Sequence, residues 1–394
     1  MIRVVLKDIV EKPITGEWGD EGTSVNVLRT TNFTNEGFID YTKVVKRDIE
    51  QKKIDTKRLH RGDIIIEKSG GSPTQPVGRV VYFDSEEIYL CNNFTAILRP
   101  KKEQVFPKYL QYILFVGHQF GLTSAFQNKT TGIINLQLPK YLEGVQVPLP
   151  PLPQQQKIAN ILDAADALRQ NDKALISKYD ELNQALFLDM FGDPVSNPKG
   201  WEKIDLGKLT KRIVVGHVGP TSDGYSKEGV PFLRTQNVRP NFINYKDIMY
   251  VKKEFHNKLQ KSKIYSEDIL ISRVGVNRGM AAIVPKDLNE ANCANVVIVG
   301  SSSYFNSLYI SFFLNKSFGT KPEYGYSVGS AQGVVNTSIV KKWPVFKIPI
   351  DLQNQFAVRV AVIEEQKAIA QKSLEKSEEL FNSLLQRAFK GELV

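Results

Sequence analysis

The stretch PLPPLPQQQKIANILDAADALRQNDKALISKYDELNQALFLDMFGDP, from Pro148 to Pro194, decides the fold. It places four prolines within six residues and then nearly forty residues without Pro or Gly. Because proline and the residue before it disfavour helix, the run fixes the start of a long helix near Gln154. A similar change, from KIPIDLQNQF to SLLQRAFKGELV, occurs over 347–394. The chain therefore predicts two long helices.

Both helices carry a seven-residue pattern in which eight of ten positions are apolar, which is typical of a coiled coil. The simplest partner for each helix is the other one, in an antiparallel pair. The alternative is that each is an amphipathic helix on a globular core. The predicted seam comprises Ile158, Ile161, Leu168, Leu175, Tyr179, Leu182, Leu186, Phe356, Val360, Ile363, Leu374, Phe381 and Leu384.

Two polar residues, Asp172 and Lys367, interrupt this seam near the middle of each helix. In an antiparallel alignment they come close, so we hypothesise that they pair and help to fix the register. The alternative is that both are simply solvated.

An internal repeat divides the rest of the chain. Its matches keep their order at offsets of about 199–205 residues, which chance explains poorly. The matched segments are VLRTTN (27–32) with FLRTQN (232–237), GDIIIEKSG (62–70) with EDILISRVG (267–275), CNNFTAIL (91–98) with CANVVIVG (293–300), TGIINL (131–136) with QGVVNT (332–337), and VPLP (147–150) with IPID (348–351).

Each half mixes helix with strand, and strands dominate. The runs DIIIEK, DILISR, GRVVYF and GMAAIV are short, β-branched or apolar and bounded by Gly, which predicts strands. FPKYLQYILFV and FNSLYISFFLN have a helical period. The predicted class is α+β, with two repeated mixed α/β domains separated by two long helices that form an antiparallel coiled coil. The predicted segments are domain 1 at 1–152, a central helix at 153–192, domain 2 at 193–351 and a C-terminal helix at 352–394.

The composition is that of a globular protein with a basic excess. Residues 154–191 and 353–390 of the two helices hold ten basic and eleven acidic residues, so the remainder carries 42 basic against 31 acidic residues. Such an excess suits a polyanionic partner. Cys91 and Cys293 lie in apolar runs and are read as buried thiols rather than a disulfide or zinc site. No run is long enough to span a membrane and the N-terminus is unlike a secretion signal, so a cytoplasmic protein is expected.

No catalytic or metal-ligating constellation stands out. The four histidines are scattered, and no phosphate-binding loop or adenine-methylation motif is present. What remains is recognition by basic and amide residues near strand ends, because Arg suits guanine edges or phosphates and Asn or Gln suits adenine edges. For each, the alternative is a surface ion pair, a turn or a cap, and residues that agree between the halves are better framework candidates. The DNA-binding candidates are Arg29, Asn32, Lys68, Arg79, Lys129, Thr130, Arg234, Asn237, Arg273, Asn277, Arg278 and Gln332.

Three stretches resemble the specificity subunits of type I restriction-modification enzymes: PLPPLPQQQKIA, DMFGDPVSNPKGWEKIDLGKL at 189–209, and IPID before the final helix. One departure is the N-terminus, MIRVVLKDIV, which lacks an NPKGW-like lead. The resemblance implies a non-catalytic subunit with two target-recognition domains, each reading half of a split DNA site. It also implies two methylation subunits that bind S-adenosylmethionine, and two motor-nuclease subunits that use ATP and Mg²⁺. No cofactor is expected on this chain.

Two other functions stay open at this point: a stand-alone DNA methyltransferase or restriction enzyme, and a coiled-coil adaptor that binds no nucleic acid. The basic excess outside the helices and the paired Arg and Asn positions argue against the adaptor. The helices, each roughly 55 Å long at ~1.5 Å per residue, would act as a ruler between half-sites.

Overall fold

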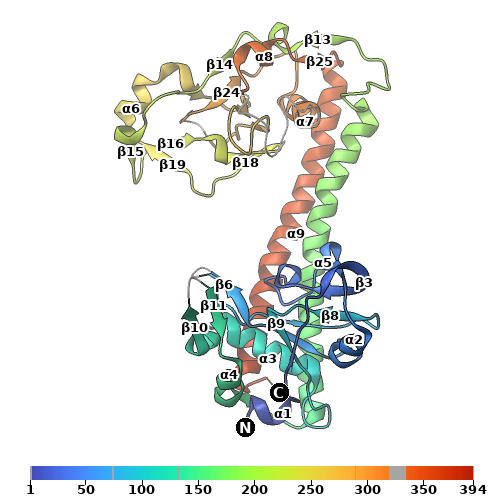
Figure 1. The fold of residues 1–394 in the computed structure, drawn as a ribbon. Helices are drawn as coiled ribbons and strands as arrows, with labels where there is room; N and C mark the ends of the chain where they lie inside the picture. The colour runs from blue at the N-terminus through green and yellow to red at the C-terminus, as the bar shows by residue number, and fades with distance from the viewer. Residues whose placement is uncertain (1, 73–74, 131–132, 289, 319–333, 394) are drawn as a thin grey trace. The chain divides into compact units, whose positions relative to one another are not determined.

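The computed structural model describes residues 2–72, 75–130, 133–288, 290–318 and 334–393. The chain forms two compact units (Figure 1). Unit 1 comprises Met1–Lys173 with Gln371–Val394, and unit 2 comprises Ala174–Ala370. Each unit therefore contains part of both long helices, whereas the four segments predicted from the sequence separate helices from domains.

The long helices are α5 (Leu152–Phe191) and α9 (Ile350–Lys390). Pro153 lies in the first turn of α5, where its missing N–H costs no helical hydrogen bond. Both helices end at a glycine with positive φ, Gly192 at 79° and Gly391 at 78°. This left-handed conformation is accessible to glycine and terminates a helix by turning the chain away.

Unit 1 is built on a four-stranded antiparallel sheet in the order β2-β9-β5-β7. Its α3 helix (Pro107–Gln119) contacts β7. A second sheet, β4-β3-β8, contains the parallel pair β3–β8, and β10-β11-β6 and β1-β12 complete the strands. The bounds are β1 Arg3–Val5, β2 Ile14–Thr15, β3 Asp20–Leu28, β4 Val45–Asp48, β5 Ile64–Glu67, β6 Ser69–Gly71, β7 Val80–Tyr82, β8 Tyr89–Cys91, β9 Thr95–Leu98, β10 Gln127–Thr130, β11 Ile133–Leu136 and β12 Gln146–Pro148, with helices α1 Leu6–Ile9, α2 Gln51–Lys57 and α4 Leu138–Gly144.

Unit 2 repeats this plan. Its four-stranded sheet has the order β14-β24-β21-β22, α7 (Ser307–Phe318) contacts β22, and β16 and β23 form the parallel pair of the sheet β15-β19-β16-β23-β20. The bounds are β13 Lys203–Asp205, β14 Ile213–Val215, β15 Tyr225–Ser226, β16 Val230–Leu233, β17 Val238–Arg239, β18 Phe242–Ile243, β19 Met249–Val251, β20 Lys263–Ile264, β21 Ile269–Ser272, β22 Ala281–Ile283, β23 Ala291–Cys293, β24 Val296–Val299 and β25 Pro344–Phe346, with helices α6 Lys253–Lys258 and α8 Thr337–Lys341. The strands and helices predicted from the repeat lie where the sequence placed them.

The hydrophobic core of each unit includes one end of both long helices. In unit 1, Ile158 and Leu162 of α5 and Phe381 of α9 join the core beneath α3. In unit 2, Phe187 and Phe191 of α5 lie in one core with Phe356 of α9. Burying large aromatic side chains contributes most to such a core, so the helix ends are integral parts of the units.

The helices pack antiparallel within each unit, but the seam on α5 differs from the prediction. Leu168, Leu175 and Leu182 are 46%, 41% and 48% exposed. The inward line runs one residue further along, through Leu162, Arg169, Ile176 and Asn183. Of the other predicted seam residues, the structure buries Ile158, Phe356, Val360 and Phe381 and half-buries Ile161, Tyr179, Leu186, Ile363, Leu374 and Leu384.

The hypothesis that Asp172 pairs with Lys367 is wrong. In unit 1, Asp172 accepts a hydrogen bond of 2.8 Å from Ser377 Oγ. In unit 2, Lys367 forms an ion pair with Asp180 instead. Each polar residue is therefore satisfied by a side chain of its own unit.

Cys91 and Cys293 are fully buried free thiols, as the apolar runs around them predicted. Burial raises the pKa of the Cys91 thiol to about 11, so it carries no thiolate character at neutral pH. Within the described ranges, no helix combines the length and the apolar character that a membrane crossing needs.

Candidate functional site

Each unit carries a similar loop directly after a strand of its second sheet, and each loop opens with a 3-10 turn. We call residues 29–40 turn 1 and residues 234–247 turn 2; both begin with an Arg-x-x-Asn sequence. In turn 1 the backbone N–H of Arg29 donates to Asn32 Oδ1 at 2.9 Å, and in turn 2 Arg234 N–H donates to Asn237 Oδ1 at 2.9 Å. The repeat therefore preserves a three-dimensional motif as well as a sequence.

The amide of each asparagine also spans its turn. Asn32 Nδ2 donates to the carbonyl of Asp40 at 2.9 Å, and Asn237 Nδ2 donates to the carbonyl of Asn244 at 3.0 Å. Both asparagines are at most 1% exposed. A buried amide with its hydrogen bonds in use cannot read a base without opening the turn. Asn32 and Asn237, predicted as DNA contacts, are therefore framework residues, the alternative that the sequence left open.

The two arginines also brace the turns. Arg29 Nη2 donates to the carbonyl of Lys43 at 3.1 Å, and Arg234 Nη2 donates to the carbonyl of Asp247 at 2.9 Å. Both side chains are half-buried. Each guanidinium retains further N–H donors, because it has five in all.

Arg79 holds turn 1 onto the sheet of unit 1. Its guanidinium makes two bonds to the carboxylate of Glu67, at 2.9 and 3.0 Å, and donates to the carbonyls of Thr30 and Phe33, both at 3.2 Å. The side chains of Arg79 and Glu67 are only 14% and 5% exposed. The pair is a charge-assisted, two-pronged contact with little solvent screening. Arg79 therefore fixes turn 1 to the sheet of unit 1.

A groove of about 550 Å³ lies beside the Arg79–Glu67 pair. Its lining includes Thr30, Asn35, Gly70 and Gln75. Asn35 is exposed at the tip of turn 1, and Gly70 is exposed on β6. The groove thus offers small polar groups next to a rigid turn, a combination suited to contacts with a polar edge.

Unit 2 fastens its turn with a neutral group. Asn277 Nδ2 donates to the carbonyl of Thr235 at 3.1 Å, the position equivalent to Thr30. Asn277 and its neighbour Arg278 are each 8% exposed. The carbonyl that Arg79 binds in unit 1 is thus bound in unit 2 by the amide of Asn277, which is not the repeat counterpart of Arg79.

Lys68 and Arg273 occupy equivalent positions just after β5 and β21. Lys68 Nζ lies 3.4 Å from Thr15 Oγ1, and burial lowers the pKa of this half-buried ammonium. Arg273 Nε donates to the carbonyl of Val335 at 3.2 Å. Both residues pack beside a strand end, with part of each side chain accessible.

The remaining candidates lie on a hairpin or outside the described residues. Lys129 and Thr130 belong to β10, where they pair with Ile134 and Ile133 of β11. The adjacent strand β6 contributes Ser69, whose Oγ donates to Asn135 Oδ1 at 2.5 Å. Gln332 falls within 319–333, outside the described residues.

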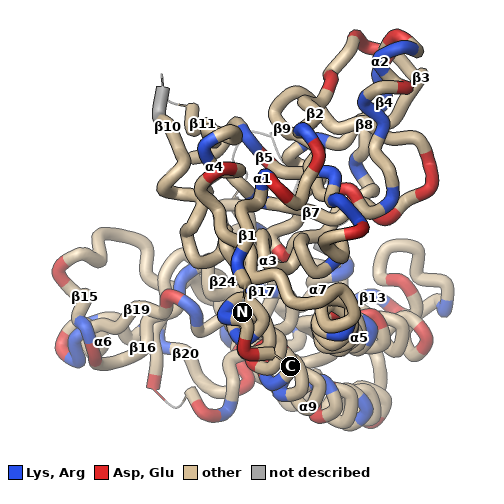
Figure 2. Tube along the Cα trace, turned by 90° about the horizontal axis from the view of Figure 1, so that it is seen from below, with Lys and Arg blue, Asp and Glu red and all other residues tan. Residues whose placement is uncertain are grey.

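Charges of both signs occur along α5 and α9, as Figure 2 shows. Outside 154–191 and 353–390, which lie within these two helices, the chain holds 42 basic and 31 acidic residues. Among the described residues, no group of His, Cys, Asp or Glu is arranged to hold a metal ion. The basic excess suits an anionic partner.

The sequence analysis missed two buried glutamines that cap helices α3 and α7. Gln155 Oε1 accepts from the backbone N–H of Phe106 at 2.8 Å, at the start of α3. Gln353 Oε1 likewise accepts from Asn306 N–H at 2.9 Å, at the start of α7. Gln155 is the fifth residue of PLPQQQ and Gln353 the fourth of IDLQNQ, so the signal in the sequence was a glutamine soon after each proline-containing entry to a long helix, not a matched position of the repeat. Each glutamine joins the first turn of a long helix to its unit.

Residues 5–178 match the family model described as "Type I restriction modification DNA specificity domain". The chain is 26% identical to a putative type I restriction enzyme MjaX specificity subunit of Methanocaldococcus jannaschii, over 93% of this chain and 84% of that protein. It is 22% identical to the type I restriction enzyme EcoKI specificity subunit of Escherichia coli K12, over 94% of this chain and 88% of that protein.

Solved structures share the fold. One, from a study of complex assembly and conformational transition of the type I R-M system, matches with a TM-score of 0.59 at 15% identity and covers 100% of this chain and 98% of that chain. Another, the S subunit of a type I restriction-modification system from M. genitalium, matches with a TM-score of 0.55 at 14% identity, covering 98% of this chain and 96% of that chain.

Proposed function

Since the chain belongs to the specificity subunits of type I restriction-modification enzymes, we propose that each of its units reads one half of a bipartite DNA site. The chain is thereby the sequence-specificity component of its system. The observation that carries the proposal is the duplicated unit, in which turn 1 and turn 2 are built by the same asparagine contacts. Two equivalent but non-identical readers suit a split and asymmetric target.

Binding would combine general affinity with local reading. The basic excess outside the helices would neutralise phosphates, which gives salt-sensitive and largely sequence-independent affinity. Base edges would be read by residues near the turns and strand ends. Asn35 beside the groove, Lys68, Lys129 and Thr130 are the proposed readers of unit 1, and Arg273 and Gln332 those of unit 2. Arg29 and Arg234 would contact phosphates with their remaining N–H groups.

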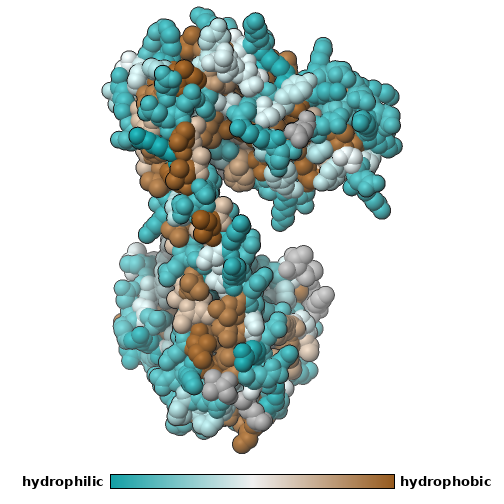
Figure 3. Space-filling model, turned by 180° about the vertical axis from the view of Figure 1, so that it is seen from behind, coloured by the Kyte–Doolittle hydropathy of each residue, from teal (hydrophilic) through white to brown (hydrophobic). Residues whose placement is uncertain are grey.

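The paired helices would serve as spacer and docking surface. Val358, Val362 and Ile369 are 66%, 56% and 57% exposed on α9. At 100° per residue they share one face, directed away from the seam. Apolar residues reach the surface of each unit in patches (Figure 3). Such a stripe supports docking of two methylation subunits, which would in turn bring two motor-nuclease subunits.

Catalysis would belong to those partners. S-adenosylmethionine would bind to the methylation subunits, and ATP with Mg²⁺ to the motor-nuclease subunits, so this chain would act as a non-catalytic reader in the cytoplasm. Its contribution to the reaction would be to place the methylation subunits on a chosen sequence.

Co-expression with the methylation subunit, followed by sequencing of methylated bases, tests the proposal. We expect methylation at a split site with two defined halves and an undefined spacer. Methylation by the purified chain alone, with labelled S-adenosylmethionine, would instead identify a stand-alone methyltransferase. Failure of the complex to bind DNA even at low salt would leave the adaptor function.

The spacer role has its own test. Seven residues would be inserted after Lys173 in α5 and seven after Ala370 in α9, at the boundary of the two units. This adds roughly 10 Å of helix, or about two to three base pairs of B-DNA. Sequencing of methylated sites should show a longer spacer between unchanged half-sites. An unchanged spacer would refute the ruler.

A further inference from the structure

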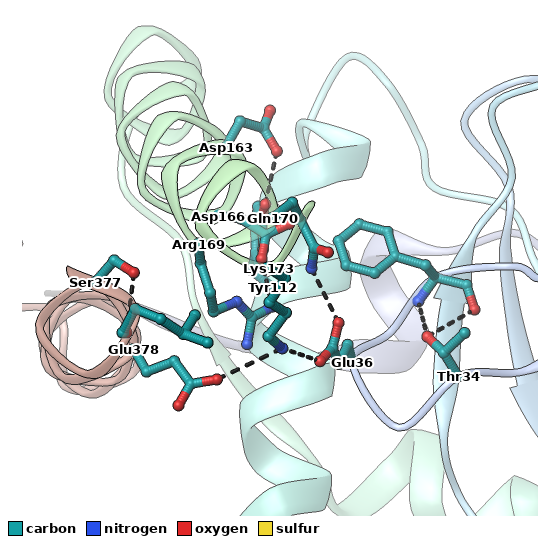
Figure 4. A network of polar contacts seen from close by, with 12 residues as sticks. Thr34, Glu36, Tyr112, Asp163, Asp166, Arg169, Gln170, Lys173, Ser377 and Glu378 are labelled. Carbon is teal, nitrogen blue, oxygen red and sulfur yellow. Dashed lines mark hydrogen bonds and ion pairs between the residues drawn. The ribbon is translucent and has the colours of Figure 1, made fainter. Parts of the chain in front are cut away.

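Turn 1 has two sides, and only one of them faces the groove. Thr30 and Asn35 line the groove, while Glu36 points toward the long helices (Figure 4). Gln170 Nε2 of α5 donates to Glu36 Oε2 at 2.9 Å, and Lys173 of α5 forms an ion pair with Glu36 Oε1. The tip of the reading turn is thus fastened to the helix.

Lys173 extends this contact to the second helix. Its ammonium lies 3.5 Å from Glu378 Oε1 of α9, so one lysine bridges turn 1, α5 and α9. The neighbouring seam is closely packed: Arg169 forms an ion pair with Asp166, and its guanidinium carbon lies 4.4 Å from the centre of the Phe381 ring. The bridge therefore starts from a well-packed part of the helix pair.

Gly37, next to Glu36, packs against α3. Its φ is +86°, and a Cβ added there would lie 2.9 Å from Phe115 and 3.0 Å from Gln111. No larger residue fits between turn and helix without displacement. The position of Glu36 is thus set on one side by close packing and on the other by α5.

The local electrostatics favour the charged form of Glu36. Burial by itself would raise the pKa of its carboxyl, but the hydrogen bonds from Lys173 and Gln170 outweigh this and hold the pKa below its usual value. At neutral pH the carboxylate is ionised and the contact is formed.

Turn 2 is held differently. Asn241 Oδ1 accepts from Asn315 Nδ2 at 2.7 Å and from Ser311 Oγ at 3.0 Å, both on α7. Its backbone N–H donates to the carbonyl of Ala281 at 2.8 Å. These contacts are neutral and come from the inner helix and sheet of unit 2, whereas turn 1 is held by charges from α5.

We propose that Glu36, held by Lys173, is a positioning residue for recognition of one DNA half-site, and that it couples turn 1 to the helix pair. Asn241 has the corresponding role for the other half-site, without a link to α5 through charge. Loosening Glu36 moves the exposed tip at Asn35 relative to the groove and relaxes the choice of bases by unit 1 alone. The inference rests on the proposed function, because it needs two half-sites to be read.

The test compares methylated sites in complexes that carry single variants of the full chain. Glu36→Gln keeps the shape of the side chain, and Lys173→Met removes the charge that holds it. We expect sites with one altered base in one half to be methylated about two- to fivefold more often, the range of a partly exposed ion pair. The other half should keep its wild-type selectivity. The exchanged pair Glu36→Lys with Lys173→Glu should recover part of the lost selectivity.

Asn241→Ala and Lys178→Met are the matched controls. Asn241→Ala should relax the half that the Glu36 variants leave intact, which assigns each half to its unit. Lys178 is exposed on α5, so its replacement should change neither half. Equal relaxation of both halves by Glu36→Gln, or no relaxation by either Glu36→Gln or Lys173→Met, would overturn the positioning role. Absence of a bipartite site with the wild-type chain would refute the proposed function instead.

Discussion

Turn 1 and turn 2 share one internal design but are attached to their units by different chemistry. In unit 1 the attachment is ionic, through Arg79 with Glu67 and Lys173 with Glu36. In unit 2 it is made by the amides of Asn277, Asn241 and Asn315. Of the two ionic contacts only Arg79–Glu67 is buried, and a buried ion pair is costly to break singly, while a neutral contact loses a hydrogen bond. A duplicated fold can thus keep its frame and still differ in how firmly each reader is held.

The largest difference should appear on removing Arg79. Arg79→Met leaves Glu67 as an unpaired carboxylate in a buried site and should lower the unfolding free energy of unit 1 by about 3–5 kcal/mol. Asn277→Ala in unit 2 should cost only about 1–2 kcal/mol. Urea-induced unfolding, monitored by hydrogen exchange in each unit separately, measures both losses of unfolding free energy. Equal costs would end the distinction between ionic and neutral attachment, and Arg79→Met with Glu67→Leu should recover most of the loss.

The shared frame predicts matched effects. Asn32→Ala and Asn237→Ala each remove a buried amide that closes a turn, so each should destabilise its unit by about 1–3 kcal/mol. Hydrogen exchange over 29–40 and 234–247 should rise by a similar factor in the two variants. A large effect in only one turn would mean that the two asparagines do not contribute equally to the stability of their turns.

The exposed stripe on α9 should matter for assembly rather than folding. Val362→Glu should leave the unfolding free energy within about 0.5 kcal/mol of wild type, because the side chain is exposed. Its dissociation constant for the methylation subunit should rise about tenfold if the stripe contributes a binding hot spot. Ala361→Glu, exposed about a quarter turn away, is the control in the same titration. Equal weakening by both variants would point to charge rather than to the stripe.

The smallest effect concerns the polar contacts between the helices. In unit 2 the Lys367–Asp180 pair is partly solvated, with Asp180 52% exposed, so Lys367→Met should cost less than about 1 kcal/mol. In unit 1 the Ser377–Asp172 bond is buried, and Ser377→Ala should cost about 1–2 kcal/mol. Thermal unfolding of the two variants compares these costs, and the reverse order would contradict this reading of burial.

The repeat, the strands and the extents of the long helices followed from the sequence, because Pro, Gly and short β-branched runs act locally. The seam of α5 did not. A heptad pattern with leucines at 168, 175 and 182 is more apolar than the line through Arg169, Ile176 and Asn183 that the structure turns inward. Hydrophobicity alone selects the first line, whereas contacts such as Asn183 with Glu364, at 2.6 Å, select the second.

The candidate site was predictable in position more than in role. Arg29, Asn32 and their counterparts were found because they repeat, yet repetition marks the frame that both turns need. Glu36 left no such signal, because its partner Lys173 is far along the chain and turn 2 uses another chemistry. Contacts that differ between the two units leave no repeated residues in the sequence, so the internal repeat does not reveal them.

The participation of α9 in the core of unit 1 has a consequence for how the chain is made. Phe381, Leu385 and Ala388 complete that core, yet they follow all of unit 2 in chain order. A ribosome adding about 5–20 residues per second needs roughly 10–40 s to travel from Lys173 to these residues. Unit 1 therefore emerges first and waits longest for its last core residues, while unit 2 also needs residues of α9, Phe356 and Val360, which are made shortly before them. Until then Ile158 and Leu162 lack their partners, and chaperones have their best opportunity to bind.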